Sequence, residues 1–574
     1  MKTTILRRLV AALATGGLLL VGVPALAPSA NAAEACGLGQ TCRGALSGTL
    51  GDTTFQITMP PTFNGTVLLY SHDYRIAQPV PAQIGTALGM DRAPYYSATT
   101  TPGVGATFVG NGIPQVAPSA ASAAQLLGQG YALAGAGYSR QGWASAEGVE
   151  AGEMLIRYVN SGAVPGVKEI YAWGDGLGGL ISQTLVQRNP GKIAGTLPRC
   201  GVLEGPLQSF SSAMTVLYTW KSLIAPTLKV ANYSPGQAGY GEAVSDLATV
   251  FGILQKVSTG ELTVSPVGYP IAQANLLAGL MAGLPTKSPT YDGVTVNPAV
   301  DTLGLGAAIQ GGYSPLSAGA STAAAMLQNV GAAAALGIMG RYDLEQRARV
   351  IGQIGAGESA NFNGNVPVNY RKLLSPEQRG EFEGTFTAAG PGVLDAMLAT
   401  LDSTVGNAAA RFPANPKAVA IVRALPAAKP VYDKPAVFLT TTYDAIVPDG
   451  NTYEFYESAA GTKSARSAAK KGMLKMVPYF TLPPADGYTS FEPGATSASA
   501  ALSAAALGGT GVGHCVFTPD QDVQTVAALR SLIRAKTASA VAAAKRIGYR
   551  VAGVNRDRQY APAPLKQPLK TVAR

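Results

Sequence analysis

The stretch from Glu169 to Gly191 constrains the fold of this chain most strongly, because an apolar run becomes a helix-like segment through a glycine-rich turn. The apolar run reads EIYAW, the turn reads GDGLGG from Gly174, and the helix-like part continues to the Asn-Pro-Gly that ends at Gly191. A short apolar run that enters a tight turn and a helix is typical of a buried strand in a parallel α/β sheet. We therefore expect a strand, a sharp turn at 174–178 and a helix here.

Short apolar runs alternate with helix-like segments on both sides of a long insertion. Further strands are expected in 53–59, 65–70, 131–138, 193–201, 435–448 and 473–483, with Asp444 just past the end of the strand in 435–448 and a last helix after 511–521. This order predicts an α/β protein with a mostly parallel, doubly wound sheet. The two parts of the core are placed at 33–203 and 431–534. Because structureless loops of more than 200 residues are rare in compact domains, we expect 204–430 to be a large helical cap insertion.

Residues 1–32 have the organisation of a secretory signal peptide. A basic start with Arg7 and Arg8 precedes an apolar stretch at 9–27, and a small-residue cleavage site ends at Ala32. The sequence therefore predicts a secreted, extracellular protein with no membrane span in the mature chain.

The net charge of +10 is concentrated at the end of the chain. From Arg534 onward there are ten basic residues and one acidic residue, Asp557. We expect 535–574 to be a basic, disordered tail, and a candidate for contact with an anionic cell-wall polymer. Because the charge belongs to the tail, it does not point to a nucleic-acid partner.

Four cysteines, Cys36, Cys42, Cys200 and Cys515, allow three pairings into two disulfides in an oxidising compartment. We favour the local bridge Cys36–Cys42 and a long-range bridge Cys200–Cys515. The cysteines include no C-x-x-C pair, and no metal site is predicted.

Two polar residues follow predicted strands after the insertion: Asp444 and His514. Gly176, Asp444 and His514 occur along the chain in the order of the nucleophile, the acid and the histidine of an α/β-hydrolase triad. In such a triad the acid orients the histidine, and the histidine takes a proton from the nucleophile. The alternatives are that Asp444 is a turn residue before Val447 and Pro448, and that His514 is a packed or surface histidine.

The chain resembles a family of secreted bacterial α/β-hydrolases. The resemblance rests on LLYSHDYR, GYALAGAGYSRQGWA, the segment from YAWGDGLGG to GVLEG, TTTYDAIVP and GHCVFTP, and it spans nearly all of the mature chain. It implies an α/β-hydrolase fold with a nucleophile elbow at 174–178. It also implies catalytic roles for Asp444 and His514 and an oxyanion hole from the loop His72-Asp73-Tyr74 and the Leu177 N–H. The pair His514-Cys515 is also similar to that of tannases and feruloyl esterases. In those enzymes the cysteine after the histidine forms a disulfide with a cysteine that directly precedes the serine. Asp175 holds that place here, which leaves Cys200 as the candidate partner of Cys515.

Three positions depart from the pattern of the family. Gly176 stands where the nucleophilic serine is expected, Asp175 where a histidine precedes it, and Asp73 where a glycine follows His72. Both carboxylates are expected to oppose a developing oxyanion. Serine at 176 alone is therefore not expected to create esterase activity without Asp175→His and Asp73→Gly.

Two functions follow as expectations. By resemblance the protein is a hydrolase of a small-molecule ester or amide, although Gly176 argues against ordinary serine hydrolysis. The alternative is a catalytically inactive pseudoenzyme that binds a ligand or partner in the inherited pocket. Neither function requires a cofactor.

Overall fold

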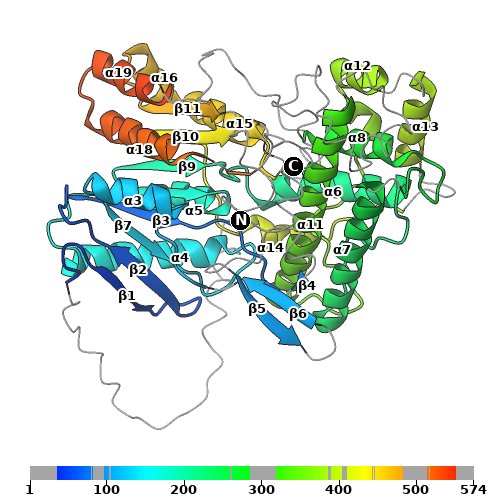
Figure 1. The fold of residues 1–574 in the computed structure, drawn as a ribbon, viewed down its shortest axis with the longest axis horizontal. Coiled ribbons are helices and arrows are strands. Elements are labelled where there is room, and N and C mark those ends of the chain that lie inside the picture. Colours follow the sequence, from blue (N-terminus) through cyan, green and yellow to red (C-terminus); the bar gives the residue numbers. More distant parts are fainter. Residues whose placement is uncertain are drawn as a thin grey trace, which may run out of the picture.

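The computed structural model describes residues 35–78, 80–81, 96–101, 105–110, 112–258, 261–284, 319–385, 390–403, 410–442, 444, 446–481, 514–515 and 517–550. In Figure 1 the sheet and its helices form one half of the molecule, and the green helices of the cap form the other. The predicted signal peptide, residues 1–32, lies outside the described residues.

The core of the fold is an eight-stranded, mostly parallel sheet. In spatial order its strands are β1 (Thr41–Leu46), β2 (Thr53–Thr58), β7 (Ala132–Ala136), β3 (Thr66–Ser71), β8 (Glu169–Asp175), β9 (Gly195–Arg199), β10 (Ala436–Thr441) and β11 (Met476–Thr481). Strand β2 is antiparallel to both of its neighbours, and the strands from β7 to β11 are parallel. The predicted doubly wound sheet is confirmed.

Both faces of the sheet are covered by helices, which explains why its central strands read as continuous apolar runs. On β3, Val67 and Leu69 pack into one hydrophobic cluster, and Leu68 and Tyr70 pack into another on the opposite face. The first cluster includes α4 (Ser145–Tyr158), its extension η1 (Val159–Ala163) and α5 (Leu177–Arg188). The second includes α3 (Ala120–Gly128), α18 (Pro519–Arg534) and α19 (Ala538–Gly548). Helices α15 (Asp449–Ala460) and α16 (Lys463–Lys470) follow β10.

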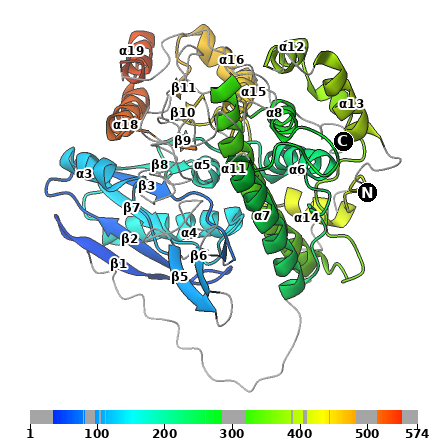
Figure 2. The same cartoon turned by 45° about the vertical axis from the view of Figure 1, so that its right-hand side comes forward.

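The segment between β9 and β10 forms the predicted helical cap (Figure 2). Buried side chains of the cap form a hydrophobic cluster separate from those on the two faces of the sheet. Its elements are α6 (Pro206–Leu223), α7 (Gly236–Ser258), α8 (Ile271–Ala282), α11 (Gly319–Gly352), η2 (Tyr370–Leu373), α12 (Pro376–Thr385), α13 (Gly390–Asp402) and α14 (Pro416–Arg423). Buried ion pairs attach α11 to the core: Arg347 to Glu147 at 3.0 Å, and Asp343 to the half-exposed Arg140. These pairs hold the cap over the carboxyl ends of the strands.

Four strands were not expected from the sequence. Strand β1 forms an edge of the main sheet, and β4 (Val80–Pro81), β5 (Tyr96–Thr101) and β6 (Gly105–Gly110) form a small separate sheet. The alternating exposure along β1 explains the first omission, because the strand has no apolar run.

The predicted disorder of 535–574 is wrong for its first part. Helix α19 begins after the N-cap Thr537, and Val541 and Ala544 are buried against the core. Its basic residues, Lys545 and Arg546, lie in the last turn, where cations favour a helix. Residues 551–574 lie outside the described part of the chain.

Within the described residues, no helix combines the length and the apolar character that crossing a membrane requires.

Candidate functional site

The predicted elbow is present between β8 and α5. Gly176 caps α5 with φ 47° and ψ −111°, a backbone conformation that favours glycine. Gly178 is also required by space, because a Cβ there would lie 2.0 Å from the Ser71 carbonyl oxygen at the end of β3. The sharp turn therefore places residue 176 at the carboxyl edge of the sheet, where the nucleophile of a hydrolase stands.

The predicted acid and histidine are in contact. His514 Nδ1 lies 2.7 Å from Asp444 Oδ2. The other oxygen of Asp444 accepts hydrogen bonds from the backbone N–H groups of Ile446 and Val447 at 2.8 and 2.9 Å. The Asp444 side chain is fully buried and thus fixed, so it can orient the imidazole as the acid of a triad does.

The third member of the constellation is Asp73. Its Oδ2 lies 2.7 Å from His514 Nε2, the nitrogen that would face a nucleophile. Its Oδ1 accepts hydrogen bonds from the N–H groups of Tyr74 at 2.6 Å and Leu177 at 2.8 Å. These two amides are the expected oxyanion hole, and a carboxylate oxygen of the protein occupies it.

Asp73 also takes the space that a side chain at position 176 would need. A Cβ built on Gly176 would lie 2.0 Å from Asp73 Oδ1, closer than real Cβ contacts come. A glycine at the elbow and an aspartate in the loop after β3 therefore fit each other, and the Asp73 carboxylate lies where a side chain of residue 176 would begin.

The electrostatics favour an imidazolium between two carboxylates. Burial alone would lower the pKa of His514, but the charges of Asp444 and Asp73 outweigh it and raise the pKa well above its ordinary value. Burial would raise the pKa of Asp73, yet the charge and hydrogen bonds of His514, with those of the two amides, hold it below its ordinary value. The site thus carries a carboxylate–imidazolium–carboxylate chain.

Asp175 does not share this chain. Its carboxylate pairs with the buried Arg199 at 3.0 Å and accepts a hydrogen bond from the Tyr70 hydroxyl at 2.9 Å. Burial raises the pKa of Asp175 to about 7 against the opposing charge of Arg199. Because the positive charge of Arg199 offsets the charge of Asp175, the structure does not support the expectation that Asp175 would oppose a developing oxyanion.

Arg199 links the elbow to α18, and sequence reasoning missed it. Its guanidinium also lies 3.0 Å from Asp522 Oδ1, and Ser122 on α3 donates to the other oxygen of Asp522 at 2.6 Å. One indication of this buried ion pair was present in the sequence, an arginine between an apolar run and Cys200, because a buried charge needs partners of opposite charge. The partners lie too far apart along the chain to be identified from it.

His72, predicted for the oxyanion loop, lies behind it. Its ring stacks on Tyr138 with centroids 3.7 Å apart, and Nδ1 lies 2.7 Å from the Asp73 carbonyl oxygen. Burial, reinforced by the charge of Arg75, holds the pKa of His72 well below its ordinary value, so the ring is neutral. Its role is to support the loop that carries Asp73.

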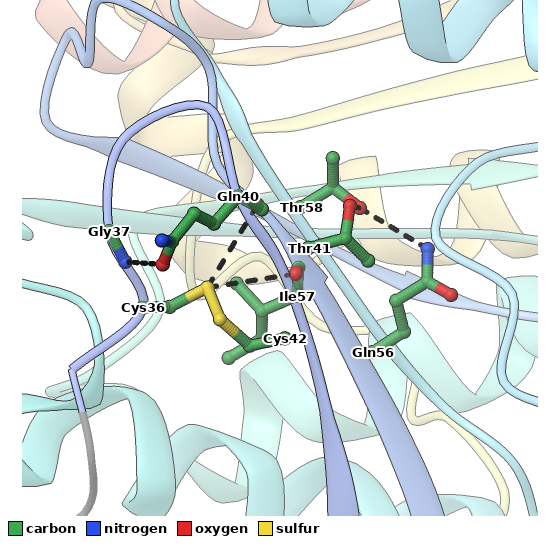
Figure 3. Close-up of a disulfide and its surroundings, with 8 residues drawn as sticks. All are labelled: Cys36, Gly37, Gln40, Thr41, Cys42, Gln56, Ile57 and Thr58. Carbon is green, nitrogen blue, oxygen red and sulfur yellow. Dashed lines mark hydrogen bonds between the residues drawn. A yellow bond between two sulfur atoms is a disulfide. The ribbon is translucent and has the colours of Figure 1, made fainter.

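Of the two predicted disulfides, the structure contains Cys36–Cys42, with Cα atoms 5.9 Å apart. Figure 3 shows this bridge beside β1 and β2. The predicted Cys200–Cys515 bridge is not formed, and both are buried free thiols. The two sulfurs lie within 4.8 Å of each other, and the Cys515 thiol interacts with Cys200 and with the Arg199 carbonyl oxygen, 3.3 Å away, as a hydrogen-bonding thiol in place of the covalent bridge.

The sulfurs of Cys200 and Cys515 and a ring nitrogen of His514 lie within 4.8 Å of one another, a spacing that could hold a metal ion. However, both nitrogens of His514 are already engaged by carboxylates. A metal would have to displace one of them, so the donor set does not favour a metal here.

A cavity of about 140 Å³ lies between this site and the cap. Asp73, Leu177 and His514 line it from the core, and Phe210 and Ala213 line it from α6. Its volume is close to that of an engineered apolar cavity of roughly 150 Å³ that binds benzene. The arrangement can therefore hold a small, mostly apolar molecule against the Asp73 carboxylate.

No protein-family model matches the chain, and no curated protein matches its sequence. Among solved structures, a lidless α/β serine hydrolase of Xanthomonas campestris is 8% identical with a TM-score of 0.20, and the match covers 29% of this chain and 64% of that one. The rice cell wall degrading esterase LipA of Xanthomonas oryzae is 13% identical over 76% of this chain and 81% of its own, with a TM-score of 0.27. Feruloyl esterase B of Aspergillus oryzae is 11% identical over 77% and 73%, with a TM-score of 0.31.

At such low similarity, the assignment of the fold depends on the molecule itself. The strand order, the elbow at Gly176 and the pairing of Asp444 with His514 are those expected of an α/β-hydrolase. The protein has the α/β-hydrolase fold, with a large helical cap and with the Asp73 carboxylate beside the elbow at Gly176.

Proposed function

We propose that the protein binds a small, mostly apolar ligand in the cavity beneath the cap and does not hydrolyse esters through a serine. The observation that carries this proposal is the Asp73 carboxylate, which accepts both oxyanion-hole hydrogen bonds. The carbonyl oxygen of an ester would need the same two N–H groups. Ordinary acyl transfer is therefore blocked twice, by the absent serine and by the occupied hole.

The cavity supports binding of an apolar ligand. Trp143 and Phe210 provide aromatic walls, with ring centroids 5.8 Å apart, and Ala213 and Val447 add aliphatic surface. The polar residues of the lining include Asp73 and His514, which contact each other at 2.7 Å. An apolar body with one polar end matches this distribution.

Secretion, predicted from residues 1–32, remains part of the proposal: the ligand would be met outside the cell. Contact of the basic segment beyond residue 550 with an anionic cell-wall polymer also remains a prediction.

Hexanol is a suitable probe, because it has an apolar body and one polar end. Calorimetric titration should show saturable binding of hexanol to the wild type. Ala213→Leu should abolish it, because the added carbons project from α6 toward the cavity. The matched control is Val350→Leu on α11, where the side chain is 79% exposed, and it should bind as the wild type does. Equal binding to both variants would show that the ligand lies elsewhere, and absence of binding to the wild type would refute the proposal.

A further inference from the structure

The Asp73 carboxylate has two different oxygens. Oδ1 accepts hydrogen bonds from the N–H groups of Tyr74 and Leu177, and Oδ2 lies 2.7 Å from His514 Nε2, in a residue that lines the cavity. The two oxygens thus differ in their partners: Oδ1 is held by backbone amides, and Oδ2 is paired with the imidazole that can give or take a proton. A structural carboxylate does not require two backbone donors, a histidine and a cavity together.

We propose that Asp73 is a nucleophile that opens the three-membered ring of an apolar epoxide through Oδ2. This inference deepens the proposed function and rests on it, since the epoxide would occupy the same cavity. Carboxylates act as covalent nucleophiles in other enzymes when a second group completes the reaction.

The filled oxyanion hole selects an sp³ carbon rather than a carbonyl carbon. Attack on an sp³ carbon creates no oxyanion on the substrate carbon, so the substrate does not need the hole. The product of attack is an ester of Asp73, whose carbonyl oxygen is Oδ1. That oxygen already accepts from Tyr74 N–H and Leu177 N–H, so the hole would serve the ester formed on the protein itself.

The first step balances with the proton that His514 carries. Oδ2 forms a bond to a ring carbon, and the bond from that carbon to the ring oxygen breaks with its electron pair. The resulting alkoxide takes the proton from His514 Nε2. Esterified Asp73 has no charge, so the pKa of His514 falls and the neutral imidazole becomes available as a base.

The second step restores the site. His514 takes a proton from water, and the hydroxide oxygen bonds to Asp73 Cγ. The oxyanion on Oδ1 is held by the two amides. When this tetrahedral intermediate collapses, the bond between Cγ and the oxygen that carries the alkyl group breaks. That oxygen takes the proton of the added hydroxyl group and leaves as part of the diol. The sum is epoxide plus water to diol, and Asp73 keeps one oxygen from water.

Two buried donors in the cavity could stabilise the leaving oxygen. The Tyr74 hydroxyl and the Trp143 indole N–H are both buried, and neither has a hydrogen-bond partner among the residues that the structure describes. Both residues line the cavity with Asp73. Buried donors without acceptors are costly in a folded protein, so a ligand oxygen is a reasonable acceptor for them. Tyr74→Phe should slow ring opening about tenfold, the factor expected when one hydrogen bond to a charged group is lost.

Incubation with the terminal epoxide of hexane in heavy-oxygen water tests the inference. After many turnovers of the wild type, peptide mapping should find heavy oxygen in the side chain of Asp73. Asp175, a carboxylate of the same cavity, is the internal control and should remain unlabelled. In His514→Gln the ester should accumulate as a mass increase of one epoxide on the Asp73 peptide, and Asp73→Asn should show neither signal.

The results separate the two proposals. If the wild type binds hexanol but Asp73 gains no heavy oxygen and no adduct, the nucleophile is refuted and the ligand pocket stands. If the wild type does not bind hexanol and Asp73 remains unlabelled, both are refuted. Diol production with label only in the product would show that water attacks the epoxide directly, and it would also overturn the role of Asp73.

Discussion

Replacing Gly176 by serine tests the steric coupling between the elbow and Asp73. The added Cβ would lie 2.0 Å from Asp73 Oδ1, and contacts under 3.0 Å essentially never occur, so the carboxylate must move by about 1 Å or more. That movement breaks its hydrogen bonds to the Tyr74 and Leu177 amides. The positive φ of Gly176 adds backbone strain for a side chain.

The size of the effect follows from these contacts. Two hydrogen bonds to a charged group are worth about 3–6 kcal/mol together. Because the Asp73 side chain is 29% exposed, water can replace part of this. With strain of about 1 kcal/mol or more, we expect Gly176→Ser to lower the free energy of unfolding by about 3–5 kcal/mol. This is a large part of the total stability of a typical domain, about 5–15 kcal/mol.

The double variant Gly176→Ser with Asp73→Gly should behave differently. It removes the collision, frees both amides and leaves the serine beside the Asp444–His514 pair. We expect hydrolysis of p-nitrophenyl acetate in the double variant, dependent on His514, and none in the single variant. Unlike the expectation from sequence, Asp175→His is not required, because Arg199 and Tyr70 hold that carboxylate. A single variant as stable as the wild type in urea unfolding, or as active as the double variant, would refute this reasoning.

Three further predictions concern the wild-type site. A fluorophosphonate probe should label no serine in the wild type, because glycine occupies the elbow; an adduct on any serine beside His514 would contradict this. Arg199→Met should lower the free energy of unfolding in urea by about 3–5 kcal/mol, because it leaves Asp175 and Asp522 buried without their cation, and a loss under about 1 kcal/mol would show that the pair is unimportant. The pKa of His514 is raised in the folded protein, so the difference in the free energy of unfolding between the wild type and Asp73→Asn should be largest between about pH 3.8 and 6.5. This difference should decline as the pH rises through the folded pKa of His514. It should also be lost as the pH falls through the lowered pKa of Asp73, and a difference that does not vary with pH would contradict the ion pair.

The positions of most core strands along the chain could be predicted from the sequence because each is an apolar run bounded by turns, whereas their spatial order was not predicted. The positions of Asp444 and His514 followed from the same pattern, since both come after strand ends. The edge strand β1 could not be predicted, because its exposure alternates and pairing with β2 determines it. Helix α19 was missed because the composition of the tail obscured a short buried face at Val541 and Ala544.

The content of the site was harder to predict than its location. Asp73 was identified as a departure next to the oxyanion hole, but only the side-chain geometry shows that its carboxylate enters the hole. Arg199 and Asp522 meet because β9 and α18 pack together, and no spacing in the sequence encodes that contact. The Cys200–Cys515 bridge was predicted from the number of cysteines and from the resemblance, yet a disulfide also requires a side-chain geometry that a sequence does not specify.

The most direct test of the account is a titration of His514 by NMR, which is practical because the chain has only two histidines. His72 should stay neutral, since the pKa of its buried ring is held well below 6.5. His514 should remain an imidazolium well above pH 6.5 in the wild type, and Asp73→Asn should lower its pKa because one of its two carboxylate partners is lost. A His514 that titrates near its ordinary pKa, or whose pKa is the same in the wild type and in Asp73→Asn, would show that the Asp73 carboxylate does not pair with His514 beside the elbow.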